Sequence, residues 1–145
     1  MKFTIPLPPK AQKRARSGAV DRGNKVFSVT YKDKGQEMEE EKLIAFLLQH
    51  RPEIAFDGPV LLGVKAFLPI PDSKPKKFKA AALAGLIRPV TKPDLDNLLK
   101  HVKDCCKGIF WLDDKQVVGY LPETGKYYGN PARWEIEIKS LTVGG

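Results

Sequence analysis

One apolar run limits the folds open to this chain more than any other segment. Residues 59–70, PVLLGVKAFLPI, are almost continuously apolar, and the turn-forming residues Gly58 and Pro59 introduce them. Strands of this composition are buried on both faces or lie at the centre of a sheet. We therefore expect residues 59–70 to form a central strand of the hydrophobic core.

Helical and extended patterns alternate along the rest of the chain. Strands are predicted over residues 2–7, about 116–121 and 132–141, where Trp134, Ile136 and Ile138 alternate with charged residues. Residues 25–30 form either a short strand or the return of a loop. Helices are predicted from residue 31 or 36 to 50, over a basic segment before Gly85, and from about 93–96 to Gly108. Together these elements predict an α+β fold with a mixed sheet of four to five strands and two main helices in two layers.

Length and composition fit one cytoplasmic domain spanning residues 1–145. The chain is 42% hydrophobic, enough for a single core, and no apolar run approaches the ~20 residues that span a bilayer. Pro6 interrupts the N-terminus before any signal-peptide core. Cys105 and Cys106 are adjacent in a predicted helix, where their side chains point in different directions, so we expect no disulfide. Two separated histidines and this cysteine pair offer no zinc-ligand spacing.

The excess of eight positive charges is concentrated in two segments. Residues 1–34 hold nine basic residues against two acids, a net of +7, and residues 73–93 hold six basic residues and no acid. Clustered cations of this kind bind nucleic-acid phosphates, although they also occur as solvated surfaces that only keep a protein soluble. We expect a basic, mobile arm at about residues 10–25. The predicted DNA-binding residues are Lys10, Lys13, Arg14, Arg16, Arg22, Lys25, Lys74, Lys76, Lys77, Lys79, Arg88 and Lys92.

Against this basic background, four aspartates flank one short predicted helix. The segment KPDLDNLLKHVKDCCKGIFWLDD, residues 92–114, begins with Asp94 and Asp96 and ends with Asp113 and Asp114. Helical spacing gives it a core-facing set of Leu95, Leu98, Leu99, Val102 and Cys106. It gives the opposite face Asp96, Lys100, Lys103 and Lys107. We expect the following strand to bring the second acidic pair back toward the start of the helix.

Each acidic residue also has a purely structural interpretation. Asp94 or Asp96 can cap the helix, and Asp113-Asp114 can form a turn before a strand. Lys100 can be an exposed partner of Asp96 one helical turn away. Taken together, however, converging carboxylates beside a lysine suit Mg²⁺ or Mn²⁺, which prefer hard oxygen ligands and can activate water for phosphodiester hydrolysis. The lysine can then stabilise the charge that develops on the attacked phosphate.

The segments KPDLDNLLK and FWLDDKQVV resemble the signature of RusA-type Holliday junction resolvases. These endodeoxyribonucleases act on four-way DNA junctions and are frequent in bacterial and prophage genomes. The family pattern is a D-x-D-N-x-x-K block followed about twenty residues later by an aspartate pair and D-x-Q-V. The matching residues here are Asp94, Asp96, Asn97, Lys100, Asp113, Asp114, Gln116 and Val117.

The resemblance implies a RusA-like two-layer fold and a set of site residues. Asp94, Asp96 and Asp114 carry over as the catalytic metal ligands, with Asp113 as the alternative third ligand, and Lys100 carries over as the catalytic lysine. Asn97 is expected to support these ligands. The implied cofactor is Mg²⁺, with Mn²⁺ as the alternative.

The implied function is resolution of four-way junctions in DNA recombination and repair. The resemblance implies a homodimer that nicks two opposing strands symmetrically, as the two-fold symmetry of the substrate also suggests. Two alternatives remain: a branched-DNA-binding protein without catalysis, and a metal-dependent nuclease acting on other DNA or RNA structures. Phe110-Trp111 and Tyr127-Tyr128 are expected to pack internally, with contacts to DNA as the alternative for both pairs and contacts to a partner subunit for the first.

Overall fold

The computed structural model describes residues 1–11, 16–22, 25–31 and 34–142, with only the backbone described between residues 16 and 37. Its main sheet is mixed and contains five strands. Four of them run in the order β1-β7-β4-β5, and the fifth, β6, also pairs with β4. The strands are β1 (Lys2–Ile5), β4 (Val60–Leu68), β5 (Val117–Tyr120), β6 (Gly125–Tyr128) and β7 (Arg133–Ser140). The predicted α+β fold with a mixed sheet is therefore confirmed.

Strand β4 is the centre of this sheet, as its apolar sequence predicts. It pairs antiparallel with β7 along one side and parallel with β5 and β6 along the other. Its register sets Val64 opposite Ile136 and Leu62 opposite Ile138, and all four side chains are buried. The opposite face is only half-buried at Lys65 and Phe67, so β4 is central without being fully buried on both faces.

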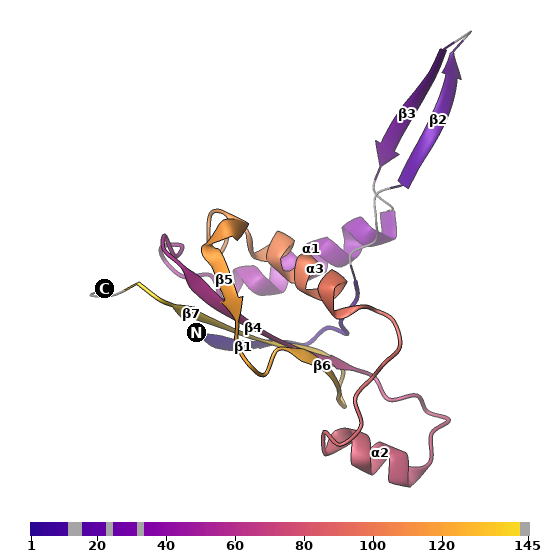
Figure 1. The fold of residues 1–145 in the computed structure, drawn as a ribbon, viewed down its shortest axis with the longest axis vertical. Coiled ribbons are helices and arrows are strands. Elements are labelled where there is room, and N and C mark those ends of the chain that lie inside the picture. The colour runs from indigo at the N-terminus through magenta and orange to yellow at the C-terminus, as the bar shows by residue number, and fades with distance from the viewer. Residues whose placement is uncertain (12–15, 23–24, 32–33, 143–145) are drawn as a thin grey trace.

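Two helices cover the apolar face of the sheet. Figure 1 shows α1 (Lys34–Leu48) and α3 (Leu95–Cys106) over the same face, with the C-terminal part of α1 beside α3. Helix α2 (Lys76–Leu83) lies apart from both, beyond the end of β6. Phe110 and Trp111, which follow α3, are fully buried, so their predicted internal packing is confirmed. No described helix is long and apolar enough to span a membrane.

A separate two-stranded ribbon contains part of the predicted basic arm. Strands β2 (Arg16–Arg22) and β3 (Lys25–Tyr31) pair antiparallel and project away from the main sheet. From the sequence, residues 25–30 were predicted to form either a short strand or the return of a loop, and no strand was predicted for residues 16–22. The alternation in RSGAVDR is weak, and its stability as a strand depends on pairing with KVFSVTY, which a local pattern does not report.

Candidate active site

The first acidic pair lies at the exposed start of helix α3. Asp94 occupies the N-cap position with an extended backbone (φ −68°, ψ 144°), yet its side chain makes no capping hydrogen bond. Asp96 lies in the first helical turn, and both side chains are exposed. The capping interpretation is therefore wrong for the Asp94 side chain. Both carboxylates lie where the positive end of the helix dipole favours negative charge.

The rest of helix α3 divides into two faces as its sequence predicts. Leu98, Val102 and Cys106 are buried, while Asn97 and Lys100 are exposed beside the first acidic pair. This strongly one-sided burial anchors the helix to the sheet and fixes which side chains face outward. A lysine and an amide are thus available close to Asp94 and Asp96 in the fold.

The second acidic pair lies in a short 3₁₀ turn, η1 (Asp114–Gln116), immediately before β5. Asp113 caps this turn by accepting a hydrogen bond from the Lys115 amide at 3.0 Å. That backbone bond lowers the pKa of Asp113; desolvation opposes this effect, and the charges of Lys115 and Lys107 reinforce it. The Asp113 carboxylate therefore serves as the cap of this turn.

Gln116 ties this turn to the body of the protein. Its Oε1 accepts hydrogen bonds from the Leu112 and Asp113 amides at 2.9 and 3.0 Å. Its Nε2 donates to the carbonyls of Phe56 and Gly58 at 2.7 and 3.0 Å. Gln116 matches the family motif, but the sequence alone suggested no role for it. The structure shows that it positions the acidic turn against the segment that enters β4.

Asp114 is connected to the hydrophobic core through Trp111. The fully buried Trp111 donates from Nε1 to Asp114 Oδ1 at 2.9 Å, while Asp114 itself is half-buried. Sequence reasoning missed this contact. An i, i+3 pairing of an indole and a carboxylate across a turn is visible in the sequence only once the turn is known.

The two acidic pairs lie at opposite ends of α3. Trp111, whose indole donates to Asp114, pairs with Lys107 at the end of α3, so Asp114 lies near the C-terminal end of the helix. Burial, then Cys105 and then Asp114, raise the pKa of Cys106, the last residue of α3. At 1.5 Å per residue, the ten residues from Asp96 to Cys106 span roughly 15 Å. In the part of the chain that the structure describes, no three His, Cys, Asp or Glu side chains are grouped to hold a metal ion.

The expected return of the second pair to the helix start is therefore not observed. Strand β5 does run back along α3, since Lys103 Nζ lies 5.7 Å from the ring centre of Tyr120 at the end of that strand. The acidic pair precedes this strand, however, and the turn η1 holds it beside the helix C-terminus. Among the described residues, Asp94 and Asp96 thus form one acidic site at the start of α3, and Asp114 lies apart from it.

The predicted DNA-binding residues fall into three groups. Lys13 and Arg14 lie outside the described residues, and the side chains of Arg16, Arg22 and Lys25 lie outside them as well. Lys10 is exposed and forms an ion pair with Glu39 of α1 at 3.2 Å. The remaining cations surround α2 and the loop before α3: Lys74, Lys76, Lys77, Lys79, Arg88 and Lys92. All of these are exposed except Lys79, which is half-buried.

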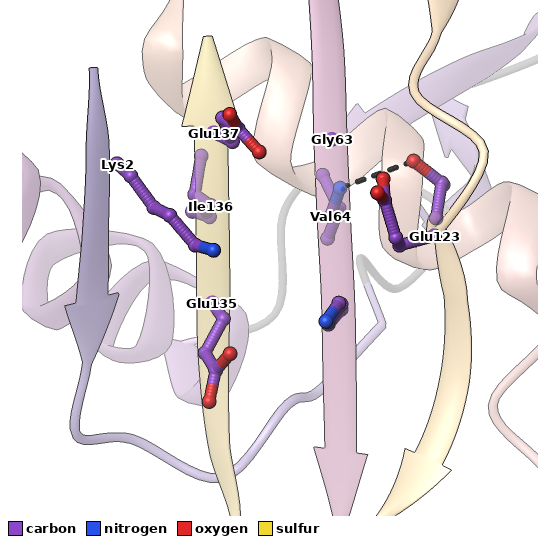
Figure 2. A pocket seen from close by; sticks show the side chains of 9 residues that line it. Lys2, Gly63, Val64, Glu123, Glu135, Ile136 and Glu137 are labelled. Carbon is purple, nitrogen blue, oxygen red and sulfur yellow. Dashed lines mark hydrogen bonds between the residues drawn. The ribbon is translucent and has the colours of Figure 1, made fainter.

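A second group of carboxylates lies on the open face of the sheet, away from α3. Figure 2 shows Glu123, Glu135 and Glu137 around a small cleft, together with Lys2. The cleft has a volume of about 50 Å³. Across the strands, Lys2 pairs with Glu137 and Lys65 with Glu135. This alternation of opposite charges is typical of cross-strand pairing on a solvated sheet face.

Comparison with known proteins decides the family. The family model of the endodeoxyribonuclease RusA matches residues 6–139, nearly the whole chain. This chain belongs to the RusA family. It is also similar to the uncharacterized protein YqaN of Bacillus subtilis (strain 168), at 37% identity over 146 residues, covering 99% of this chain and 98% of that protein. Membership of the RusA family indicates an endodeoxyribonuclease and confirms the resemblance drawn from the two acidic segments.

Proposed function

We propose that this RusA-family protein is a metal-dependent resolvase that nicks four-way DNA junctions at symmetric positions. The observation that carries the proposal is the exposed start of α3, where Asp94 lies at the N-cap without a capping bond, with Asp96 and Lys100 beside it. Helix capping does not account for the Asp94 side chain, and the matched family cleaves DNA. Recombination and repair are the processes in which four-way junctions arise.

Asp94 and Asp96 are the proposed first ligands of Mg²⁺, or of Mn²⁺ as the alternative. Such an ion would supply an activated water and neutralise charge on the leaving oxygen. The three carboxylates of the proposed set do not fit one ion as the chain is described, because Asp114 lies beyond the other end of α3. Asp114 can join the pair only if the turn η1 is rearranged or if a second chain supplies it.

The residues around this acidic pair have separable roles. Lys100 is exposed one turn into α3, where its ammonium can approach a phosphate bound at the helix start. Removing a single charge-stabilising donor from an active site typically costs 10²–10³ in rate. Asn97 is exposed in the same turn and is proposed to orient the carboxylates by hydrogen bonding.

The proposed assembly is a homodimer. A four-way junction has two equivalent strands to cut, and two copies of one site related by a two-fold axis would meet both. The basic residues around α2 and those of segment 10–25 are the proposed contacts to the DNA arms. Their contribution would be electrostatic and would weaken with increasing salt.

The first experiment compares cleavage of a synthetic four-way junction with cleavage of a matched duplex, a fork and an RNA duplex. Each reaction is run in Mg²⁺, in Mn²⁺ and in EDTA. Asp94→Asn, Asp96→Asn and Asp114→Asn are the test variants, and Asp104→Asn is the control, since Asp104 is an exposed acid on the same helix outside the motif. We expect paired, metal-dependent nicks on the junction that disappear in the test variants and persist in the control.

Different results in this experiment would indicate one of the two alternative functions. Tight junction binding with no cleavage in either metal would indicate a branched-DNA-binding protein. Equal cutting of the duplex, fork or RNA would indicate a nuclease of different selectivity. Mixing the Asp96→Asn and Asp114→Asn chains tests the origin of the third carboxylate. Restored nicking would show that two chains share a site, whereas continued inactivity of a verified mixed dimer would place all three acids in one chain.

A further inference from the structure

A groove beside the acidic helix start is not part of the metal site. It has a volume of about 450 Å³ and lies between the segment that leaves β4, helix α2, strand β6 and the loop before α3. Lys92 and Pro93 are among its lining residues, and Asp94 is the next residue in the chain. The groove therefore borders the start of α3, where the carboxylates proposed for cleavage lie.

The charge of the groove is entirely positive. Three of its lining residues are cations, Lys74, Arg88 and Lys92, and none of its lining residues is an acid. The Arg88 guanidinium is fixed in place, because its Nε donates to the Lys126 carbonyl at 2.5 Å and its centre lies 3.8 Å from the ring centre of Tyr127. A held cation and two exposed lysines favour a polyanion over a neutral ligand.

Aromatic rings supply the remaining recognition chemistry. Phe78 of α2 and Tyr128 of β6 both line the groove, and their rings meet edge to face with centroids 5.9 Å apart. Both side chains are half-buried, so part of each remains accessible. Lys74 Nζ lies 4.9 Å from the Phe78 ring centre, which brings a cation and an aromatic surface to the same point. Aromatic rings interleaved with cations are the usual platform for unpaired nucleotides.

The loop between the groove and α3 is fixed to the sheet. Lys126 Nζ donates to the Thr91 carbonyl at 2.6 Å, and the bond from Arg88 reaches the Lys126 carbonyl of the same strand. These two bonds hold residues 88–91 against β6. The position of the groove relative to the start of α3 is therefore fixed, as a binding site beside a cleavage site requires.

We propose that this groove binds an unpaired nucleotide of the branched DNA and places the adjoining phosphate at Asp94 and Asp96. This inference rests on the proposed function for the cleavage step, whereas the binding of unpaired DNA is tested without it. A volume of this size suits one or two nucleotides rather than a duplex. A four-way junction offers such nucleotides at its crossover, where base pairs are most easily opened.

The test measures binding of a fluorescent twelve-residue oligothymidylate and of a matched duplex by anisotropy in EDTA, so that no cleavage occurs. Tyr128→Leu and Phe78→Leu remove a ring and keep an apolar side chain, and thermal melts establish that each variant is folded. Lys139→Gln, at an exposed cation on β7 outside the groove, is the control for a surface substitution elsewhere. Because stacking on one aromatic ring contributes about 1–3 kcal/mol per base, each ring variant should weaken oligothymidylate binding by about 5-fold or more. The affinity for duplex should change by less than about 2-fold, as should both affinities in Lys139→Gln.

A second measurement locates the nucleotide directly. A junction carrying 5-iododeoxyuridine at the crossover is irradiated on the Asp96→Asn chain, and the crosslinked peptide is identified by mass spectrometry. We expect Phe78 or Tyr128 to crosslink from the crossover and not from a paired arm. Unchanged oligothymidylate affinity in both folded ring variants, or no binding by the native chain, would overturn the groove proposal even if the junction is cleaved. Ring-dependent binding without junction cleavage would retain the groove and reject the proposed function.

Discussion

The contact between Trp111 and Asp114 makes a quantitative prediction about stability. In Asp114→Ala the fully buried indole loses the acceptor that now lies 2.9 Å from its Nε1. A buried donor left without an acceptor costs about 1–3 kcal/mol. At about 2.1 cal/mol/K per residue, a chain of 145 residues has an unfolding entropy near 0.3 kcal/mol/K, so the melting temperature should fall by about 3–10 °C.

Two variants separate this hydrogen bond from the charge. Asp114→Asn keeps a carbonyl oxygen as acceptor and should lose less than about 1 kcal/mol. Asp96→Ala changes an exposed side chain and should stay within about 0.5 kcal/mol of the native chain. Thermal unfolding is followed by circular dichroism at neutral pH without metal. The reasoning is refuted if Asp114→Ala melts within 2 °C of Asp96→Ala, because Trp111 would then not depend on that carboxylate.

The same variants separate a catalytic from a structural role for Asp114. If the carboxylate acts in cleavage, Asp114→Asn should be inactive while remaining nearly as stable as the native chain. If Asp114 only anchors the turn, Asp114→Asn should cleave normally and Asp114→Ala should lose activity in proportion to its instability. Rates measured well below both melting temperatures distinguish the two cases.

Three further predictions concern neighbouring groups. His101 is buried, its Nδ1 has no partner among the described residues, and burial lowers its pKa despite nearby acids, Glu40 first. The neutral His101 side chain contributes its full stability above the ordinary pKa of 6.5, and this stability is lost as pH falls through the lower pKa of the folded state. His101→Phe should therefore show a smaller decline in melting temperature than the native chain between pH 7 and about 5. The lowered pKa of Asp113 stabilises the fold above the ordinary value of 3.8, and this contribution disappears as pH falls through the lower folded value. Urea midpoints of Asp113→Asn should therefore lie below those of the native chain at pH 5 and approach them as pH falls below 3.8, and a constant difference would contradict this. Gln116→Leu removes four hydrogen bonds around the turn and should cost about 1–3 kcal/mol; we expect junction cleavage to fall while anisotropy shows unchanged junction binding.

Local periodicity predicted the fold wherever one segment carried its own signal. The apolar run of β4 and the alternation of Trp134 and Ile136 in β7 each specify a buried face without reference to other segments. Strand β6 was missed because GKYY shows no alternation and forms a strand through pairing with β4. Its Tyr127 stacks on Phe67 across that pairing, which agrees with the packing predicted for it.

The sequence proposes residues for the candidate site but does not give their arrangement in space. Chemistry and family resemblance select Asp94, Asp96 and Asp114 because few other residue types hold Mg²⁺. Their positions depend on where the chain reverses after α3. The capping bond of Asp113, the indole bond of Asp114 and the Gln116 contacts complete that reversal before β5 begins. Strand β5 follows the acidic pair, so it is the residues of β5, such as Tyr120 beside Lys103, that return along α3. The acidic pair itself stays at the C-terminal end of the helix. The separation of the acids along α3 is thus set by the turn η1, and any cleavage that needs all three acids depends on a change in that turn or on a second chain.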